Sequence, residues 1–137
     1  MQRMGIAVAE QKALIVDDSD VLRRLIEMCL KPAGFQIASA STGAEALEIA
    51  ASFEPDLVLL EIGLPDMTGW DVLAGLRESS TTRDAKVMIL SGHEGIGSEA
   101  KERGANGAIV KPFRNDELRR AAVEMVAAPA DEAAAPF

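Results

Sequence analysis

The fold can be inferred first from one segment, Leu57-Val58-Leu59-Leu60-Glu61-Ile62-Gly63-Leu64-Pro65-Asp66-Met67-Thr68-Gly69. Its first four residues are all apolar, which is typical of a strand buried on both faces of a parallel sheet. The apolar run stops at an acidic residue, and the glycine and proline residues that follow predict a turn. The middle of the chain is therefore expected to hold a buried strand that ends in a carboxylate and a loop.

Four further apolar runs are expected to form strands, at residues 13–16, 35–38, 87–90 and 108–110. Apolar residues at helical spacing fill each interval and continue after the last run. Ser41 or Thr42 is expected to cap the second helix. The fourth helix, over residues 97–103, is expected to be weak. The inward faces of the other four are expected to carry, in chain order, Leu22, Leu25, Ile26 and Cys29; Leu47, Ala50 and Ala51; Trp70, Leu73 and Leu76; and Leu118, Ala121, Ala122 and Met125. This alternation predicts a three-layer α/β domain around a five-stranded parallel sheet.

Composition and charge exclude several classes of protein. The 137 residues fit one domain, and the hydrophobic and charged fractions of 48% and 26% are those of an ordinary globular protein. A net charge of -8 argues against direct binding to the phosphate backbone of nucleic acids. One cysteine and one histidine exclude a disulfide framework and a His/Cys metal cluster within the chain.

Membrane and targeting signals are not expected. No apolar run approaches the ~18 residues of a membrane span, and the apolar patch over residues 5–9 is too short for a signal peptide. The sequence therefore predicts a cytoplasmic protein with no membrane partner. One folded domain is expected over residues 12–127, between flexible segments at 1–11 and 128–137.

Polar residues follow the ends of the expected strands: Asp17 and Asp18, Glu61, Ser91 and Lys111. Because the carboxyl ends of neighbouring parallel strands meet at one edge of a sheet, these side chains are expected to converge. Three carboxylates that lie close together repel one another, and a hard cation such as Mg²⁺ relieves that repulsion. A hydroxyl and an ammonium beside them suit a phosphoryl group. The residues predict a magnesium-dependent phosphoryl site.

From about Lys12 to Ala127 the chain resembles the receiver domains of two-component response regulators. The matching segments are Leu14-Ile15-Val16-Asp17-Asp18, residues 57–69, Ile89-Leu90-Ser91-Gly92, Gly104-Ala105-Asn106-Gly107 and Lys111-Pro112-Phe113. Each segment alone is weakly diagnostic, but together, in this order and spacing, they are specific. The resemblance implies a flavodoxin-like (βα)5 fold with strand order 2-1-3-4-5.

The resemblance also implies site residues and partners. It assigns Mg²⁺ to Asp17, Asp18, Glu61 and the main-chain carbonyl of Gly63, a switch hydroxyl to Ser91, phosphoryl binding to Lys111 and a cis peptide bond to Pro112. A sensor histidine kinase or phosphotransfer protein would donate the phosphoryl group, and a downstream protein would bind the face made by the fourth helix, fifth strand and fifth helix. The chain would then be a phosphoacceptor signalling domain and not an enzyme, with no effector domain attached.

Two positions depart from the family pattern. Glu61 stands where the family has its acceptor aspartate, and its carboxylate is displaced by ~1.5 Å because the side chain is one methylene longer. Glu61 either mimics the phosphorylated state or blocks phosphorylation. The replacement is engineered or natural, and the intact remainder of the pocket favours the first. Ala108 stands where family members often carry the aromatic residue of the switch.

Two other functions are compatible with parts of the sequence. The segment Asp18-Ser19-Asp20-Val21-Leu22 also resembles the first motif of haloacid-dehalogenase-type phosphatases. That family needs a further acidic pair downstream of the lysine, and the segment after Lys111 is expected to form only a helix and a tail. A phosphorylation-independent interaction adaptor with a receiver fold stays open because of Glu61.

Overall fold

Five parallel strands form the central sheet of the computed structural model, which describes residues 10–128. The strands are β1 Lys12–Val16, β2 Gln36–Ala40, β3 Leu57–Glu61, β4 Lys86–Ser91 and β5 Gly107–Val110. Their order across the sheet is β2-β1-β3-β4-β5. This confirms the flavodoxin-like topology implied by the resemblance, and it places β1, β3 and β4 side by side in the centre.

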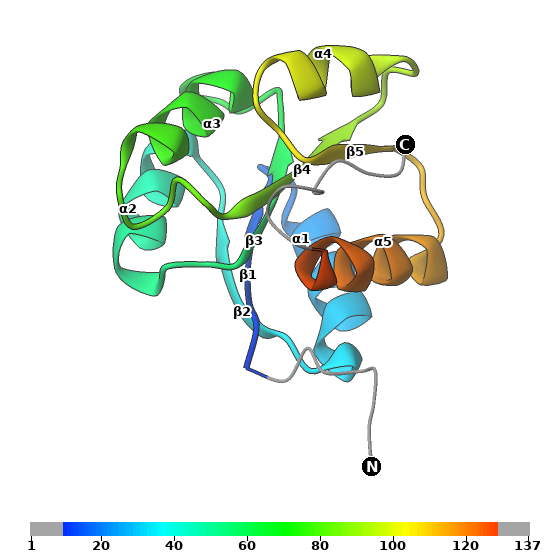
Figure 1. Cartoon of the computed structure of the whole chain (residues 1–137). Helices are drawn as coiled ribbons and strands as arrows, with labels where there is room; N and C mark the ends of the chain where they lie inside the picture. Colours follow the sequence, from blue (N-terminus) through cyan, green and yellow to red (C-terminus); the bar gives the residue numbers. More distant parts are fainter. Residues whose placement is uncertain (1–9, 129–137) are drawn as a thin grey trace.

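Helices cover both faces of the sheet (Figure 1). The elements are α1 Asp20–Leu30, η1 Lys31–Ala33, α2 Gly43–Phe53, α3 Gly69–Glu78, α4 Ile96–Glu102 and α5 Asn115–Ala127. Helices α1 and α5 pack on one face, and α2, α3 and α4 pack on the other. None of the helices in the described part of the chain is long and apolar enough to span a membrane.

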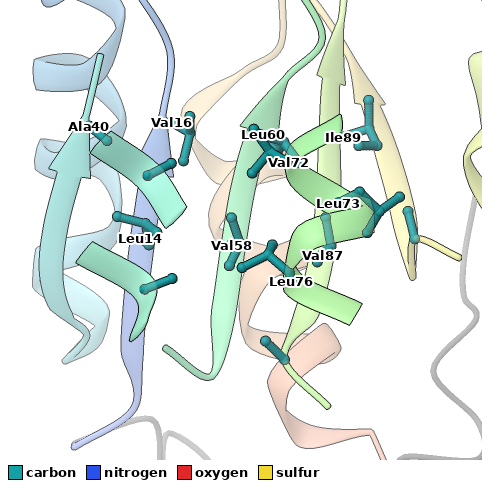
Figure 2. Close-up of a cluster of buried hydrophobic side chains, with 14 of the residues drawn as sticks. Leu14, Val16, Ala40, Val58, Leu60, Val72, Leu73, Leu76, Val87 and Ile89 are labelled. Carbon is teal, nitrogen blue, oxygen red and sulfur yellow. The ribbon is translucent and has the colours of Figure 1, made fainter. Parts of the chain in front are cut away.

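The central strands are buried on both faces, as their continuous apolar runs predict. In β1, Leu14 and Val16 belong to the cluster under α2, α3 and α4, whereas Ala13 and Ile15 belong to the cluster under α1 and α5. Figure 2 shows the first cluster, in which Val72, Leu73 and Leu76 of α3 pack on side chains of β1, β3 and β4. The strand period of two therefore supplies both cores.

Helix capping agrees with the sequence in part. Thr42 is the N-cap of α2, and its side chain accepts a hydrogen bond from the backbone N–H of Glu45. Thr68 caps α3 in a reciprocal capping box with Asp71, which fixes where α3 begins after the loop that follows β3.

Three expectations were wrong in detail. Leu25 is 49% exposed, because Ile26, Cys29 and Leu30 fill the inward face of α1 and Leu25 lies about a quarter turn outside it. Ala51 is exposed for the same reason, beyond Ala46 and Ala50 on α2. The second strand covers Gln36–Ala40 and not 35–38. The flexibility expected at the two ends falls mainly on residues 1–9 and 129–137, which lie outside the described residues.

The amino edge of the sheet holds the end of α5. Lys86, the first residue of β4, donates hydrogen bonds from Nζ to the carbonyl oxygens of Met125 and Ala128, at 2.9 and 2.7 Å. Gln11, Lys86 and Val126 line one hollow at this edge. The first strand and the last helix thus begin and end close together.

Candidate functional site

The carboxyl edge of the sheet brings Asp17, Glu61 and Lys111 together. Asp17 follows β1, Glu61 ends β3 and Lys111 follows β5. The Lys111 ammonium lies 3.3 Å from Asp17 Oδ2 and donates a hydrogen bond to Glu61 Oε1. Asp17 is only 1% exposed, and the other two side chains are largely buried. One ammonium therefore contacts two carboxylates and offsets only part of their charge.

Main-chain N–H groups hold the other oxygen of each carboxylate. Ser19 N donates to Asp17 Oδ1 at 2.9 Å, and Gly63 N donates to Glu61 Oε2 at 3.1 Å. Both donors come from the loop immediately after the strand that carries the acid. Each carboxylate is thus oriented by its own loop as well as by Lys111.

The three pKa values shift in different directions. Burial raises the pKa of Asp17 above its ordinary value, although the Ser19 N–H and Lys111 partly offset it. Burial also acts on Glu61, but the hydrogen bonds from Lys111 and Gly63 outweigh it, and the net pKa of Glu61 is lowered. The pKa of Lys111 is raised, because its contacts with Glu61 and Asp17 outweigh its burial. At neutral pH the Glu61–Lys111 pair is fully ionised.

The other expected site residues lie around this cluster without joining it. The side chain of Asp18 is exposed, so the expected convergence of three carboxylates is not seen. Among residues 10–128, no three acidic, histidine or cysteine side chains lie close enough to hold a metal together. Ser91 is 5% exposed, and its Oγ accepts a hydrogen bond from His93 N at 3.0 Å. Ala108 is half-buried, and the Lys111–Pro112 peptide bond is cis.

The backbone around Glu61 is fixed by a close approach at Gly69. Gly69 N donates to the carbonyl oxygen of Ile62 at 2.7 Å. A Cβ atom at position 69 would lie 2.3 Å from the carbonyl oxygen of Glu61, so only glycine fits there. The first residue of α3 therefore lies directly against the main chain of Glu61.

The loop between β3 and α3 is also tied to the N-terminus of α2. Asp66 accepts hydrogen bonds from Gly43 N on Oδ1 and from Ala44 N on Oδ2, at 2.8 and 2.9 Å. These N–H groups belong to the first turn of α2, where a negative charge is favourable. The hydrogen bonds lower the pKa of Asp66, so the loop and the helix are linked through an ionised carboxylate.

Acid is expected to break this link. A carboxyl whose pKa is depressed by folding stabilises the folded state above its unfolded pKa, and the contribution is lost as the pH falls through the folded pKa. In NMR spectra, the amide signals of Gly43 and Ala44 should therefore titrate with a midpoint below 3.8, the ordinary value for aspartate. The Asp66→Ala variant should abolish this titration. A midpoint at or above the ordinary value would contradict the assigned hydrogen bonds.

The sequence analysis missed an exposed apolar stripe on α1. Val21, Leu25 and Met28 are 70%, 49% and 64% exposed, and they are the large exposed apolar residues of the described chain. Their i, i+4, i+7 spacing places them on one side of the helix. The spacing was visible in the sequence, but Leu25 was assigned to the buried face.

A groove connects this stripe to the site. It measures about 460 Å³ and is lined by Leu22, Leu25, Lys111, Pro112, Phe113 and Asn115. Lys111 thus belongs both to the carboxylate cluster and to the rim of an apolar groove. The site is open toward α1.

Comparison with known proteins gives a consistent result. Residues 13–123 match the sequence model of the response regulator receiver domain. The chain is 42% identical over 107 residues to the transcriptional regulatory protein KdpE of Mycobacterium tuberculosis, covering 77% of this chain and 46% of that protein. It is 35% identical over 109 residues to the cell cycle transcriptional regulator CtrA of Caulobacter vibrioides, covering 78% and 46%. The chain therefore spans about half the length of the curated relatives it matches.

Solved structures show the same fold. The chemotaxis response regulator CheY4 of Vibrio cholerae matches with a TM-score of 0.80 and 29% identity, over 86% of this chain and 99% of that one. The receiver domain of the sensor histidine kinase PA1611 from Pseudomonas aeruginosa matches with a TM-score of 0.79 and 25% identity, over 88% and 100%. The second structure holds a magnesium ion coordinated in its active site cleft.

Proposed function

Because the chain belongs to the receiver domain family of response regulators, we propose that it is a phosphorelay signalling domain in which Glu61 occupies the phosphoacceptor position. A sensor histidine kinase or a phosphotransfer protein is the donor in this function. The observation that carries the proposal is the contact of Lys111 with both Asp17 and Glu61 at the carboxyl edge of the sheet. An ammonium among carboxylates at a strand end suits the oxygens of a phosphoryl group.

Glu61 is proposed to block phosphoryl transfer rather than to mimic its product. A mimic has to engage both Lys111 and the switch hydroxyl of Ser91. Glu61 contacts Lys111, whereas Ser91 Oγ accepts from the N–H of His93 in its own loop. In residues 10–128, no hydrogen bond joins Ser91 to Glu61. Only one of the two contacts is made, which supports a resting pocket.

Magnesium is the proposed cofactor, and the groups that would hold it are Asp17, Asp18, Glu61 and the main-chain carbonyl of Gly63, once the exposed side chain of Asp18 turns toward the other two carboxylates. The donors fit a hard cation in kind, because they are carboxylate and carbonyl oxygens. The raised pKa of Asp17 also supports a cation, since burial leaves this carboxylate incompletely compensated by Lys111. When bound, the ion would supply positive charge to the carboxylates and to an incoming phosphoryl group.

The apolar stripe on α1 is the proposed docking face for the phosphoryl donor. Val21, Leu25 and Met28 lie beside the groove that reaches Lys111, so a partner seated on them would lie next to the acceptor position. A downstream protein is proposed to bind the separate face of α4, β5 and α5. The two faces meet at the start of α5, where Asn115 lines the groove beside α1.

A charge in the α1 stripe is expected to slow transfer from a protein donor. In a Glu61→Asp background, Met28→Glu should lower the rate of transfer from the cognate kinase by about tenfold or more, because a charge would be buried in an apolar contact. Uptake from a small phosphodonor should be unchanged. The exposed Glu48→Gln substitution on α2 is the matched control. Equal loss with both donors would contradict a docking role.

The function as a whole is tested by phosphoryl uptake. The chain and its Glu61→Asp variant are incubated with Mg²⁺ and a small phosphodonor, and then with candidate kinases, and the mass of the intact protein is measured. Mass gain by the variant alone supports the acceptor position and the block. If neither protein gains mass from any donor, the proposed function fails and the phosphorylation-independent adaptor replaces it.

A further inference from the structure

A contact between α3 and α4 is not used by the chemistry of the pocket. Trp70 lies in the first turn of α3, and the guanidinium of Arg103 lies 4.7 Å from the centre of its ring. Arg103 is the C-cap residue of α4, and its Nε also donates to Glu99 Oε2 at 2.8 Å. The ion pair with Glu99, one turn earlier, orients the guanidinium over the ring. Cation–π contact thus joins the start of α3 to the end of α4.

Arg77 of α3 is a second cation that holds the C-terminal end of α4. Arg77 donates from Nε and Nη2 to the carbonyl oxygen of Gly104, at 3.1 and 3.0 Å, and from Nη2 to Asn106 Oδ1 at 3.0 Å. Asn106 Oδ1 in turn accepts from Val87 N at 2.8 Å, which ties the turn after α4 to β4. The C-terminal end of α4 is therefore attached to both α3 and β4.

The N-terminal end of α4 has fewer polar attachments, although its first residue, Ile96, is buried in the core cluster under α2, α3 and α4. Its N-cap is Gly95, which has a φ of 85° and offers no side-chain hydrogen bond to the first turn. A Cβ atom at Gly92 or Gly95 would meet no neighbour within 4 Å, so this part of the loop is open on the outside. The loop begins at Ser91, beside the pocket. The two ends of α4 thus differ in their polar contacts, which gather at the C-terminal end, whereas the N-terminal end is held by the apolar packing of Ile96.

The C-terminal end of α4 is connected to the acceptor position through α3. Gly69 lies against the carbonyl oxygen of Glu61, and Trp70 is the next residue. The capping box of Thr68 and Asp71 makes this first turn rigid. Helix α3 therefore connects the backbone of Glu61 to the C-terminal end of α4. At Ala108, where an aromatic side chain would fill the space under α4, there is only a methyl group.

We propose that Trp70 and Arg103 are positioning residues that make the C-terminal end of α4 a pivot. A rearrangement at Ser91 then tilts α4 about Arg103 and moves its N-terminal end, and the turn at Gly104 and Asn106 stays in place. The inference rests on the proposed function, because it describes how a change at the phosphoacceptor pocket reaches the face of α4, β5 and α5.

The first test needs no phosphoryl donor. Hydrogen exchange is measured at the amides of Arg103, Gly104 and Ala105 in the intact chain. Trp70→Leu and Arg103→Gln should each speed exchange by about two- to fivefold, as expected for the loss of one exposed cation–π contact. The double variant should exchange no faster than Arg103→Gln alone, which already removes the contact with Trp70, and additive effects would overturn the proposal.

Conservative variants separate positioning from general stability. Trp70→Phe and Arg103→Lys keep a ring and a cation, so both should restore most of the slow exchange. Arg120→Gln removes an exposed arginine with a similar partner, Asp116, four residues earlier, and should leave α4 unaffected. Equal acceleration by Arg103→Lys and Arg103→Gln would overturn the role of the cation. Because Arg103 is at the surface, these variants are expected to fold.

The second test follows the response to phosphorylation in the Glu61→Asp protein. Intact mass reports phosphoryl uptake, and exchange reports the movement of α4. The change should be confined to residues 92–98 in the parent and should spread to 103–105 when Arg103→Gln is added, with the same mass gain. An equal change at both ends in the parent overturns the pivot. Absence of any mass gain contradicts the proposed function instead, and the first test then decides the positioning role alone.

Discussion

Replacement of Glu61 by aspartate is expected to raise the rate of phosphoryl uptake by about 100-fold or more. In-line transfer depends on placing the attacking oxygen, and a displacement of about 1 Å can cost on the order of 100-fold. The extra methylene of Glu61 displaces its carboxylate by ~1.5 Å, which is more than this 1 Å. Its length also lets it reach Lys111, so the same ammonium that should receive phosphoryl oxygens is already engaged. The shorter aspartate side chain is expected to reduce both the displacement of the carboxylate and its contact with the Lys111 ammonium.

The rate is measured as the increase in the phosphorylated fraction of intact protein with time, in Mg²⁺ and a small phosphodonor. Glu61→Gln is the control, since it keeps the length and hydrogen-bonding shape of the side chain but removes the nucleophilic carboxylate. It should accept nothing. Comparable uptake by the chain and by Glu61→Asp would show that the position of the carboxylate does not limit transfer.

Replacement of Arg77 by methionine is expected to lower the free energy of unfolding by about 2–4 kcal/mol. The guanidinium donates to the carbonyl oxygens of Arg83, Ala85 and Gly104, and also to Asn106 Oδ1. Methionine fills a similar volume but leaves these acceptors without the Arg77 donor, and the hydrogen bonds to the Ala85 carbonyl oxygen and to Asn106 Oδ1 are partly buried. The loss should appear as a fall of about 10 °C in the melting temperature.

Thermal and urea unfolding of matched variants checks this value. Arg77→Lys keeps the charge but not the planar fork, so it should recover only part of the loss. Arg83→Met removes an exposed arginine from the neighbouring loop and should change the stability by less than about 0.5 kcal/mol. If Arg77→Met and Arg83→Met have similar stability, Arg77 does not have the structural role assigned to it.

Much of the fold follows from the sequence because the core strands are apolar on both faces. The apolar run Leu57 to Leu60, bounded by a turn, favours the centre of a parallel sheet, and the polar residue after each strand then lies at its carboxyl edge. This reasoning placed Glu61 and Lys111 correctly relative to each other.

The rest depends on tertiary contacts that spacing alone does not specify. The apolar residues of α1 fit more than one choice of buried face, and one of these choices includes Leu25. The packing of Ile26 and Leu30 selects the face that leaves Leu25 exposed. The structure differs from the expected cluster of three carboxylates, because Lys111 contacts both Asp17 and Glu61 and offsets part of their charge, while Asp18 is exposed. Arg77 gave no signal at all, because most of its partners are carbonyl groups of the backbone.

The hollow shared by Gln11, Lys86 and Val126 has a practical consequence for protein engineering. The described chain enters and leaves the domain there, at the amino edge of the sheet, whereas Lys111 lies at the carboxyl edge. Domains whose two ends lie close together tolerate insertion into a surface loop of another protein and circular permutation. This domain can accordingly be grafted as a cassette into a reporter enzyme, with its pocket directed away from the host.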